Sequence, residues 1–278
     1  MKIDILAPVH TYPHGNSDNF GLHVAAIARH LNADVHALIL HADFPHVSSV
    51  LGDMLVDVSS LMSDAKAKSC DRGSALIQAM ELEMKRIGIS LRTTEVKCFE
   101  GLFGDTVTSH ARYHDLVLVG IGPDDTTMQE TAEAAIFGSG RPTLLVPESS
   151  LPATFEHVMI AWDGSRVAAR AVSDACDFLQ RAQSITIVSV TDEKILPHDD
   201  PGNKLAEYLI RHDIQATVAQ VQGRGHPIAE TLQEHARETG ADMLVMGAFG
   251  HSRIRDFVLG GATNGILKDL RLPVLLSH

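Results

Sequence analysis

The chain has little cysteine and no long apolar run, and each shortage excludes a class of protein. Its three cysteines, Cys70, Cys98 and Cys176, lie far apart and include no CxxC spacing. We therefore expect neither a disulfide framework nor a cysteine-based zinc site, and a reducing compartment such as the cytoplasm is the natural location. No stretch approaches 18 consecutive apolar residues, so we expect no transmembrane helix and no membrane partner. The first residues, MKIDILAPVHTYPHG, lack the pattern of a secretory signal.

Basic residues are also in short supply. Lys and Arg total 23 against 35 Asp and Glu, which gives a formal net charge of −12. Such a chain does not hold nucleic acid or anionic lipid through a general basic field, so we expect no nucleic-acid partner, and any anion must bind at a local site. Apolar residues make up 45% of the chain and charged residues 21%, which is typical of a globular protein with a packed core.

The two halves of the chain repeat one another, and their boundary is marked by turn-forming residues. Residues 147–156 (PESSLPATFE) contain two prolines and two serines without an apolar period, which indicates a linker. We predict two domains, residues 1–149 and 156–278. Three pairs of segments correspond in the same order: 5–9 with 159–163 (ILAPV, MIAWD), 110–120 with 235–247 (HARYHDLVLVG, HARETGADMLVMG), and 141–147 with 272–278 (RPTLLVP, LPVLLSH).

The halves differ in length at two places. Ala7 and Ala161 are 154 positions apart, whereas Gly120 and Gly247 are 127 apart, so the first half holds 27 extra residues. They fall within residues 44–86, whose pattern is mostly helical. The second half has four more residues after its fourth strand, in a glycine-rich loop.

The second half alternates predicted strands with stretches of helical spacing. This alternation, together with segments that are apolar on both faces such as MLVM, predicts an α/β fold with a parallel sheet. Ligands of such folds bind outside the carboxyl ends of the strands, where the strand order reverses. The predicted strands are 157–161, 184–190, 214–221, 242–246 and 273–277.

A glycine-rich loop follows the fourth strand of the second half. Gly247, Gly250 and Gly260 have G-x2-G-x9-G spacing, and such glycines let backbone amides approach an oxyanion, to which a helix N-terminus adds partial positive charge. One helix end contributes only about 0.3–1 kcal/mol, whereas micromolar binding needs about 8 kcal/mol, so a base and a sugar must also be held. The helix that follows opens with Gly261, Ala262 and Thr263.

Asp163 ends the first strand of the second half, in the segment AWDGS. With a strand order of 3-2-1-4-5, the first and fourth strands flank the point where the order reverses, so Asp163 and Gly247 would face one crevice. A carboxylate at this position is typically used to accept ribose hydroxyls. Asp163 is equally suited to cap the helix that begins near Ser165, and the two roles are compatible.

These segments carry a family resemblance. VMIAWDGS at 158–165 and the segment from GHPIAET at 225 to the last residue resemble a universal stress protein domain. DILAPV, DLVLVG and RPTLLVP fit the same pattern in the first half, so the chain resembles a tandem universal stress protein. The resemblance implies two doubly wound five-stranded parallel α/β domains with strand order 3-2-1-4-5, of the adenine nucleotide alpha hydrolase-like type. It also implies pairing of the last strands, LLVP and VLLSH, within the chain, and a homodimer of two chains.

The resemblance also implies a ligand. In the ATP-binding branch of the family, the motif G-x2-G-x9-G-[S/T] holds the phosphates, an aspartate after the first strand holds the ribose, and residues that end the second strand contact adenine. Gly261 stands at the [S/T] position, which removes a hydroxyl and keeps the backbone N–H. With no dedicated catalytic base near the loop, the implied function is a stress-response sensor or regulator that binds ATP with Mg²⁺ and hydrolyses it slowly at most. The implied site residues are Asp163, Val190, Met246, Gly247, Gly250, Gly260, Gly261, Ala262 and Thr263.

The first half departs from this pattern. Its loop at 120–142 lacks the G-x2-G-x9-G spacing and carries Asp124 and Asp125 where phosphates would approach, while Val9 or His10 takes the place of the first-strand aspartate. Two carboxylates repel a triphosphate, so we expect this domain not to bind a nucleotide in the same way.

Two alternatives stay open. The first is a scaffold or interaction protein in which the glycines only form turns. The second is a metal site among the 16 histidines, since converging imidazoles can bind zinc or copper. No HExxH spacing is present, so scattered histidines are the favoured interpretation, with His10 and His41 as the first pair to inspect. The histidines near the first two strand ends are His10, His14, His23, His36, His41 and His46.

Overall fold

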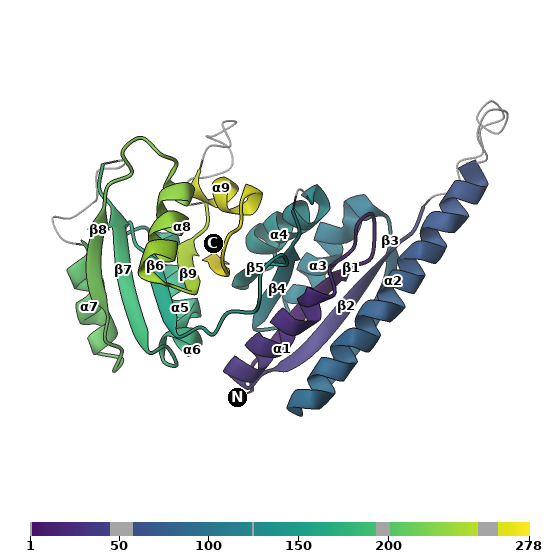
Figure 1. The fold of residues 1–278 in the computed structure, drawn as a ribbon, viewed down its shortest axis with the longest axis horizontal. Coiled ribbons are helices and arrows are strands. Elements are labelled where there is room, and N and C mark those ends of the chain that lie inside the picture. The colour runs from purple at the N-terminus through teal and green to yellow at the C-terminus, as the bar shows by residue number, and fades with distance from the viewer. Residues whose placement is uncertain (1, 45–57, 124, 193–200, 250–260) are drawn as a thin grey trace. The chain divides into compact units, whose positions relative to one another are not determined.

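The chain forms two compact units, Met1–Ser139 and Gly140–His278, each built around a largely parallel sheet (Figure 1). The computed structural model describes residues 2–44, 58–123, 125–192, 201–249 and 261–278. None of the helices in these ranges combines the length and the apolar composition needed to cross a bilayer.

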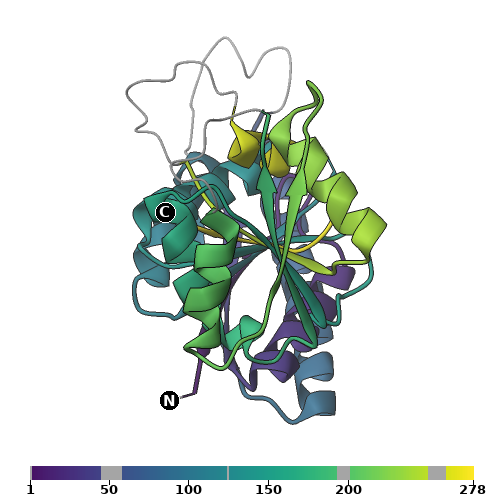
Figure 2. The ribbon, with the colours of Figure 1, turned by 90° about the vertical axis from the view of Figure 1, so that its left-hand side faces the viewer.

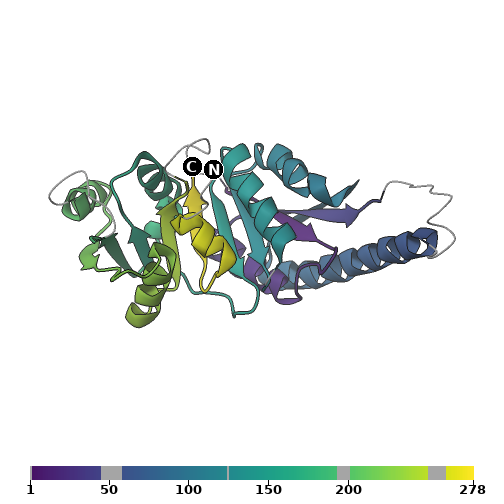
Figure 3. The ribbon, with the colours of Figure 1, turned by 90° about the horizontal axis from the view of Figure 1, so that it is seen from above.

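The described strands of the first unit have the order β3-β2-β1-β4 and are parallel. Figures 1 and 3 show α1 and α2 on one face of this sheet and α3 and α4 on the other. The elements are β1 (Asp4–His10), α1 (Asn19–Leu31), β2 (Asp34–Ala42), α2 (Val58–Ile87), β3 (Leu91–Cys98), the 3-10 turn η1 (Glu100–Leu102), α3 (Phe103–Ala111), β4 (Leu116–Ile121) and α4 (Thr126–Gly138).

The central strands of the first unit are buried on both faces. All six residues of β4 (LVLVGI) are buried, which is the pattern of a parallel strand covered by helices on either side. Asn32 is the C-cap of α1, and its N–H bonds the carbonyls of Ala28 and Arg29 from a left-handed backbone (φ 51°). Asp125 is the N-cap of α4, and its carboxylate accepts the N–H of Met128 at 3.0 Å.

The segment 44–86, where the sequence places the extra residues in a mostly helical pattern, contains a long helix from residue 58 onward, and residues 45–57 lie outside the described ranges. α2 has 30 residues and buries Leu76, Met80 and Met84. A Cβ added at Gly73 would lie 2.5 Å from the His41 ring, so α2 packs very closely against β2 at this point.

The second unit contains the predicted doubly wound sheet. Its parallel strands have the order β8-β7-β6-β9-β10, which is 3-2-1-4-5 in chain order and confirms the predicted fold class. Figure 2 shows α7 and α8 on opposite faces of this sheet. The elements are β5 (Thr143–Pro147), β6 (His157–Ala161), α5 (Arg166–Asp174), α6 (Cys176–Leu179), β7 (Ser184–Val190), α7 (Pro201–Ile210), β8 (Thr217–Val221), α8 (Ile228–Thr239), β9 (Met243–Gly247), α9 (Ala262–Lys268) and β10 (Val274–Ser277).

The strand predicted at 214–221 begins three residues late. Ile214 is buried, but its N–H donates to the carbonyl of Leu209 at 3.1 Å, so it completes the end of α7. The turn depends on Asp213, whose φ is 60°. An apolar residue at this position therefore belongs to the helix end and not to β8.

β5 pairs with β10 in antiparallel register, with Leu144 opposite Leu275. This confirms the predicted pairing of the LLVP and VLLSH strands. By sequence β5 ends the first repeat, yet its contacts place it in the second compact unit. The compact units therefore divide the chain before β5, whereas the sequence repeat places the boundary after it.

The predicted linker at 147–156 is fastened to the second unit. Phe155 is 2% exposed, and the Asp242 carboxylate accepts hydrogen bonds from Thr154 Oγ1 at 2.5 Å and from the backbone N–H groups of Glu156 at 2.9 Å and His157 at 3.1 Å. The segment lacks an apolar period, but one buried ring and one carboxylate hold its second half in place.

Candidate functional site

The carboxyl ends of β6 and β9 bring the predicted ribose residue and the glycine loop to one edge of the second sheet. These strands are hydrogen-bonded in parallel, with Ile160 opposite Val245. Asp163 follows β6 by two residues, and Gly247 is the last residue of β9. The strand order reverses between these two strands, which is where open α/β sheets bind ligands.

Asp163 shapes the turn into α5 without being its N-cap. Its Oδ1 accepts the N–H of Ser165 at 2.9 Å, and the Ser165 hydroxyl accepts the N–H of Ala168 at 3.2 Å. Ser165 is therefore the N-cap of α5, which corrects the expectation that Asp163 fills that role. The Asp163 carboxylate is half-buried and is held in a fixed orientation by its own turn.

Gly247 is needed for helix packing. A Cβ at this position would lie 2.5 Å from the backbone nitrogen of Ala168 and 2.6 Å from the carbonyl carbon of Val167. Backbone atoms cannot move aside as a flexible side chain can, so only glycine lets α5 lie this close to β9. The alternative interpretation was that Gly247 only forms a turn. The structure gives it a packing role instead, and this role requires no ligand.

The two ends of the glycine-rich loop meet at this edge. The N–H of Phe249 donates to Thr263 Oγ1 at 3.2 Å, and the N–H of Ala248 donates to the carbonyl of Ser277 at 2.8 Å. Gly261 is the N-cap of α9, and a Cβ added there would meet none of the described atoms within 4 Å. Ala262, the next residue, is half-buried. Gly250, Gly260 and the residues between them lie outside the described ranges.

Val190, which the resemblance implies to contact the base, ends β7 and is half-buried. Met246, another implied site residue, lies in β9 and is 5% exposed. The neighbouring Trp162 is fixed at two points, because its carbonyl accepts the Ser189 hydroxyl at 2.8 Å and its Nε1 donates to the carbonyl of Pro201 at 3.0 Å. Its indole thus contacts the start of α7.

Asp192, which the sequence analysis did not single out, connects the loops after β7 and β8. Its carboxylate accepts the backbone N–H groups of Gly223 at 2.6 Å and Arg224 at 2.8 Å, and these hydrogen bonds lower the pKa of Asp192. The sequence signal that could have identified this contact is an acidic residue, Asp192, just after β7 together with a glycine, Gly223, just after β8.

The matching edge of the first unit has a different character. His10 ends β1 and is 2% exposed, its ring lies 5.6 Å from that of Phe103, and neither ring nitrogen bonds a described residue. Burial lowers the pKa of His10 to about 4, although Asp125 opposes the shift. Asp125 is 6% exposed and its carboxylate caps α4 by accepting the Met128 N–H, while Asp124 lies outside the described ranges.

His10 and His41 do not converge on a metal site. His41 bonds Glu95 at 2.9 Å and lies against Gly73 of α2, whereas His10 lies against Phe103 of α3, on the other face of the sheet. Within the part of the chain that the structure describes, no group of three or more His, Cys, Asp or Glu side chains could hold a metal ion. His46 falls outside it.

Family comparison agrees with the geometry of the second unit. The model of the universal stress protein family matches residues 154–278. This part of the chain is a universal stress protein domain. A universal stress protein of Synechocystis is 41% identical over 46 residues, which span only 16% of this chain and 16% of that protein. A putative universal stress protein of Staphylococcus haemolyticus is 25% identical over 139 residues, covering 44% of this chain and 84% of that protein.

Solved structures extend the likeness in fold to both units. A universal stress protein of Archaeoglobus fulgidus covers 99% of this chain and 96% of its own, with a TM-score of 0.73 at 13% identity. A universal stress protein solved in complex with cAMP is 26% identical and covers 44% of this chain and 97% of its own, but its TM-score of 0.33 is too low to transfer its ligand. The first unit thus shares the fold, while the family match itself lies in the second.

Proposed function

We propose that the universal stress protein domain binds an adenine nucleotide, ATP with Mg²⁺, at the carboxyl edge of β6 and β9. The observation that carries the proposal is that Asp163 and the two ends of the glycine-rich loop lie at the point where the strand order of the second sheet reverses. On this proposal the protein is a cytoplasmic stress-response sensor or regulator, and it hydrolyses ATP slowly at most.

Each group of residues has a proposed part in binding. The Asp163 carboxylate accepts the ribose hydroxyls, and Val190 at the end of β7 contacts the base. Mg²⁺ binds chiefly through phosphate oxygens and water and needs few protein ligands, so it is compatible with an edge built from backbone amides. The phosphates are proposed to lie against Gly247, Gly250, Gly260, Gly261, Ala262 and Thr263.

Calorimetric titration of ATP with Mg²⁺ into the full chain tests the proposal. Asp163→Asn keeps an oxygen for the Ser165 N–H and loses the charge, so its affinity is expected to fall about tenfold, the effect of losing about 1.4 kcal/mol. Gly261→Ser adds a hydroxyl where a Cβ meets no described atom and is expected to bind more tightly. Trp162, the one tryptophan of the chain, gives a fluorescence readout next to Asp163.

The competing function is a scaffold whose loop is purely structural, and the packing role of Gly247 favours it. A scaffold predicts neither heat of binding nor fluorescence change in the wild type and in both variants, and that result would overturn the nucleotide proposal. Association of two chains into a homodimer is a separate proposal, which sedimentation of the full chain tests.

A further inference from the structure

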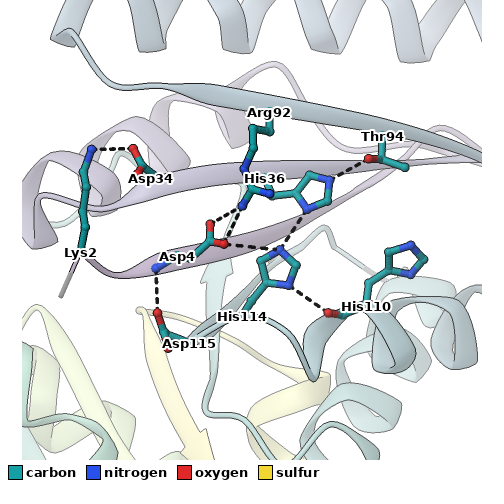
Figure 4. Close-up of polar contacts among 9 residues, drawn as sticks. All are labelled: Lys2, Asp4, Asp34, His36, Arg92, Thr94, His110, His114 and Asp115. Atoms are coloured by element: carbon teal, nitrogen blue, oxygen red, sulfur yellow. Dashed lines mark hydrogen bonds and ion pairs between the residues drawn. The ribbon is translucent and has the colours of Figure 1, made fainter.

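The first unit holds a cluster of polar side chains at the amino ends of its strands, at the opposite end of the sheet from His10 (Figure 4). His36 lies near the start of β2, and His114 lies just before β4. Their rings face each other, with His36 Nδ1 2.9 Å from His114 Nε2. His114 is 6% exposed and His36 is half-buried, so water does not screen the pair fully.

The hydrogen bonds of the pair determine which nitrogen carries a proton. The carbonyl of His110 can only accept, so His114 Nδ1, at 2.9 Å from it, must donate. In a neutral His114 ring, Nε2 is then an acceptor, and His36 Nδ1 must donate to it. His36 Nε2 is left to accept the hydroxyl proton of Thr94 at 2.8 Å. The neutral pair therefore has a single allowed arrangement, with the proton on Nδ1 of both rings.

This chain of hydrogen bonds can take one proton and stay intact. A proton that binds His36 Nε2 lets that nitrogen donate to Thr94 Oγ1, and the proton on His36 Nδ1 then passes to His114 Nε2. Every donor still faces an acceptor, and the positive charge rests on His114. A second proton cannot bind with the hydrogen bonds intact, because both facing nitrogens then carry N–H groups and neither can accept. Two cationic rings then face each other.

A carboxylate held by an arginine lies beside the facing nitrogens of the pair. Asp4 Oδ2 on β1 lies 3.9 Å from His114 Nε2, and Arg92 on β3 binds the same carboxylate at 2.5 Å. Burial, then the charges of His114 and Arg92, lower the pKa of His36, against the opposite influence of Asp4 and with a small further lowering by His110 on α3. Asp115, before β4, accepts the backbone N–H of Asp4 at 3.0 Å and adds a second carboxylate near the pair.

We propose that His36 and His114 form an acid-sensitive switch in the first unit, which binds one proton with its hydrogen bonds intact and separates on binding a second. Separation breaks the side-chain connection between β2 and the turn that joins α3 to β4. Before Asp115 the turn is otherwise held by short-range backbone hydrogen bonds, from Tyr113 N–H to the His110 carbonyl at 3.1 Å and from His114 N–H to the Ala111 carbonyl at 3.0 Å. Asp115 itself stays fastened to β1, because its N–H donates to the Asp4 carbonyl at 2.9 Å, so acid releases the part of the turn that precedes it.

Imidazole nitrogen NMR of the full chain tests the proton assignments without any mutation. At high pH both rings are expected to carry their proton on Nδ1. On acidification the pair is expected to titrate in two steps more than about one pH unit apart, with the first charge on His114. In His114→Gln, His36 is expected to titrate in a single step at a higher pH than the second step of the wild type, because a like charge is removed.

Amide hydrogen exchange tests the release. Protection of the Tyr113 and His114 amides, corrected for intrinsic rates, is expected to fall about tenfold across the second step, the change that corresponds to a coupling of one pH unit. His36→Gln is expected to abolish this fall. The matched control is His157→Gln, because His157 bonds Thr186 at 3.0 Å at the start of β6 and has no second imidazole as a described hydrogen-bonding partner. Independent titration of the two rings, or unchanged protection after both are charged, would overturn the proposal.

Discussion

His10 shows how one buried side chain makes a whole fold sensitive to acid. The ring is 2% exposed and its nitrogens bond none of the described residues, so the folded chain holds it neutral, with a pKa of about 4. In the unfolded chain the same ring is hydrated and has the ordinary histidine pKa near 6.5. The difference in the His10 pKa between the folded and unfolded chain determines how His10 affects the free energy of unfolding.

The first prediction follows from the sign of that difference. Above about pH 6.5 both states are neutral at His10 and the fold keeps its full stability. As the pH falls toward 4 the unfolded chain binds the proton first, so the free energy of unfolding falls, by about 2 kcal/mol at pH 5. Urea unfolding at pH 7.5 and pH 5 measures this loss. His10→Gln is expected to be less sensitive to acid, and an unchanged pH dependence in that variant would show that another group is responsible.

Side-chain hydrogen bonds could be predicted from the sequence only where the two partners are close in the chain. The turn from Asp163 to Ser165 lies within three residues, and the sequence indicated a cap there, although it chose the wrong side chain. His36 and His114 are 78 positions apart, and no spacing rule connects them. Only the parallel register of the strands places both rings at the same end of the sheet.

Gly247 illustrates a glycine whose meaning depends on a neighbouring helix. The sequence singled it out as part of a phosphate-binding spacing, and in the structure it lies against the first turn of α5. Both roles require a missing side chain, so the sequence alone cannot separate them. The boundaries of β6 and β7 were predicted correctly, and each apolar run starts at a polar residue, His157 or Ser184. The start of β8 was hidden by Ile214, which closes α7.

The second prediction compares two glycines of the same loop. Gly247→Ala forces a Cβ into backbone atoms 2.5 Å away and is expected to lower the free energy of unfolding by about 1–3 kcal/mol or more. Gly261→Ala meets no described atom within 4 Å and only weakens a helix N-cap, so its cost is expected to be about 0.5–1 kcal/mol. Chemical unfolding of both variants measures the difference. Equal costs would mean that α5 can move away from β9 freely.

β5 connects the two repeats of the chain by pairing with the last strand of the second. Leu144, Leu145 and Val146 are fully buried, as are Leu275 and Leu276 of β10. The family resemblance indicated this pairing, since it implied that the last strands meet. What the repeat could not indicate is that β5 groups with the second compact unit, because compactness depends on contacts and not on sequence correspondence.

The third prediction tests how firmly β5 is held. Leu151 is 82% exposed, so a protease site can be placed there, after β5 and before β6. The two fragments are expected to stay together on gel filtration after cleavage, because burying each apolar side chain of β5 contributes about 1.5–3 kcal/mol. The same cleaved chain carrying Leu144→Asp is expected to separate. Separation of the cleaved wild type would contradict a stable β5–β10 pair.

Because β5 pairs with β10, it is synthesised well before the strand that it must bind. β10 leaves the ribosome about 130 residues after β5, a delay of roughly 6–26 s at about 5–20 residues per second. During that interval the edge of β5 that pairs with β10 has no hydrogen-bonding partner. Because the five residues of β5 are apolar or β-branched, this exposed edge is a site at which chains can aggregate. The nascent chain therefore exposes an aggregation-prone edge until its second half has been translated.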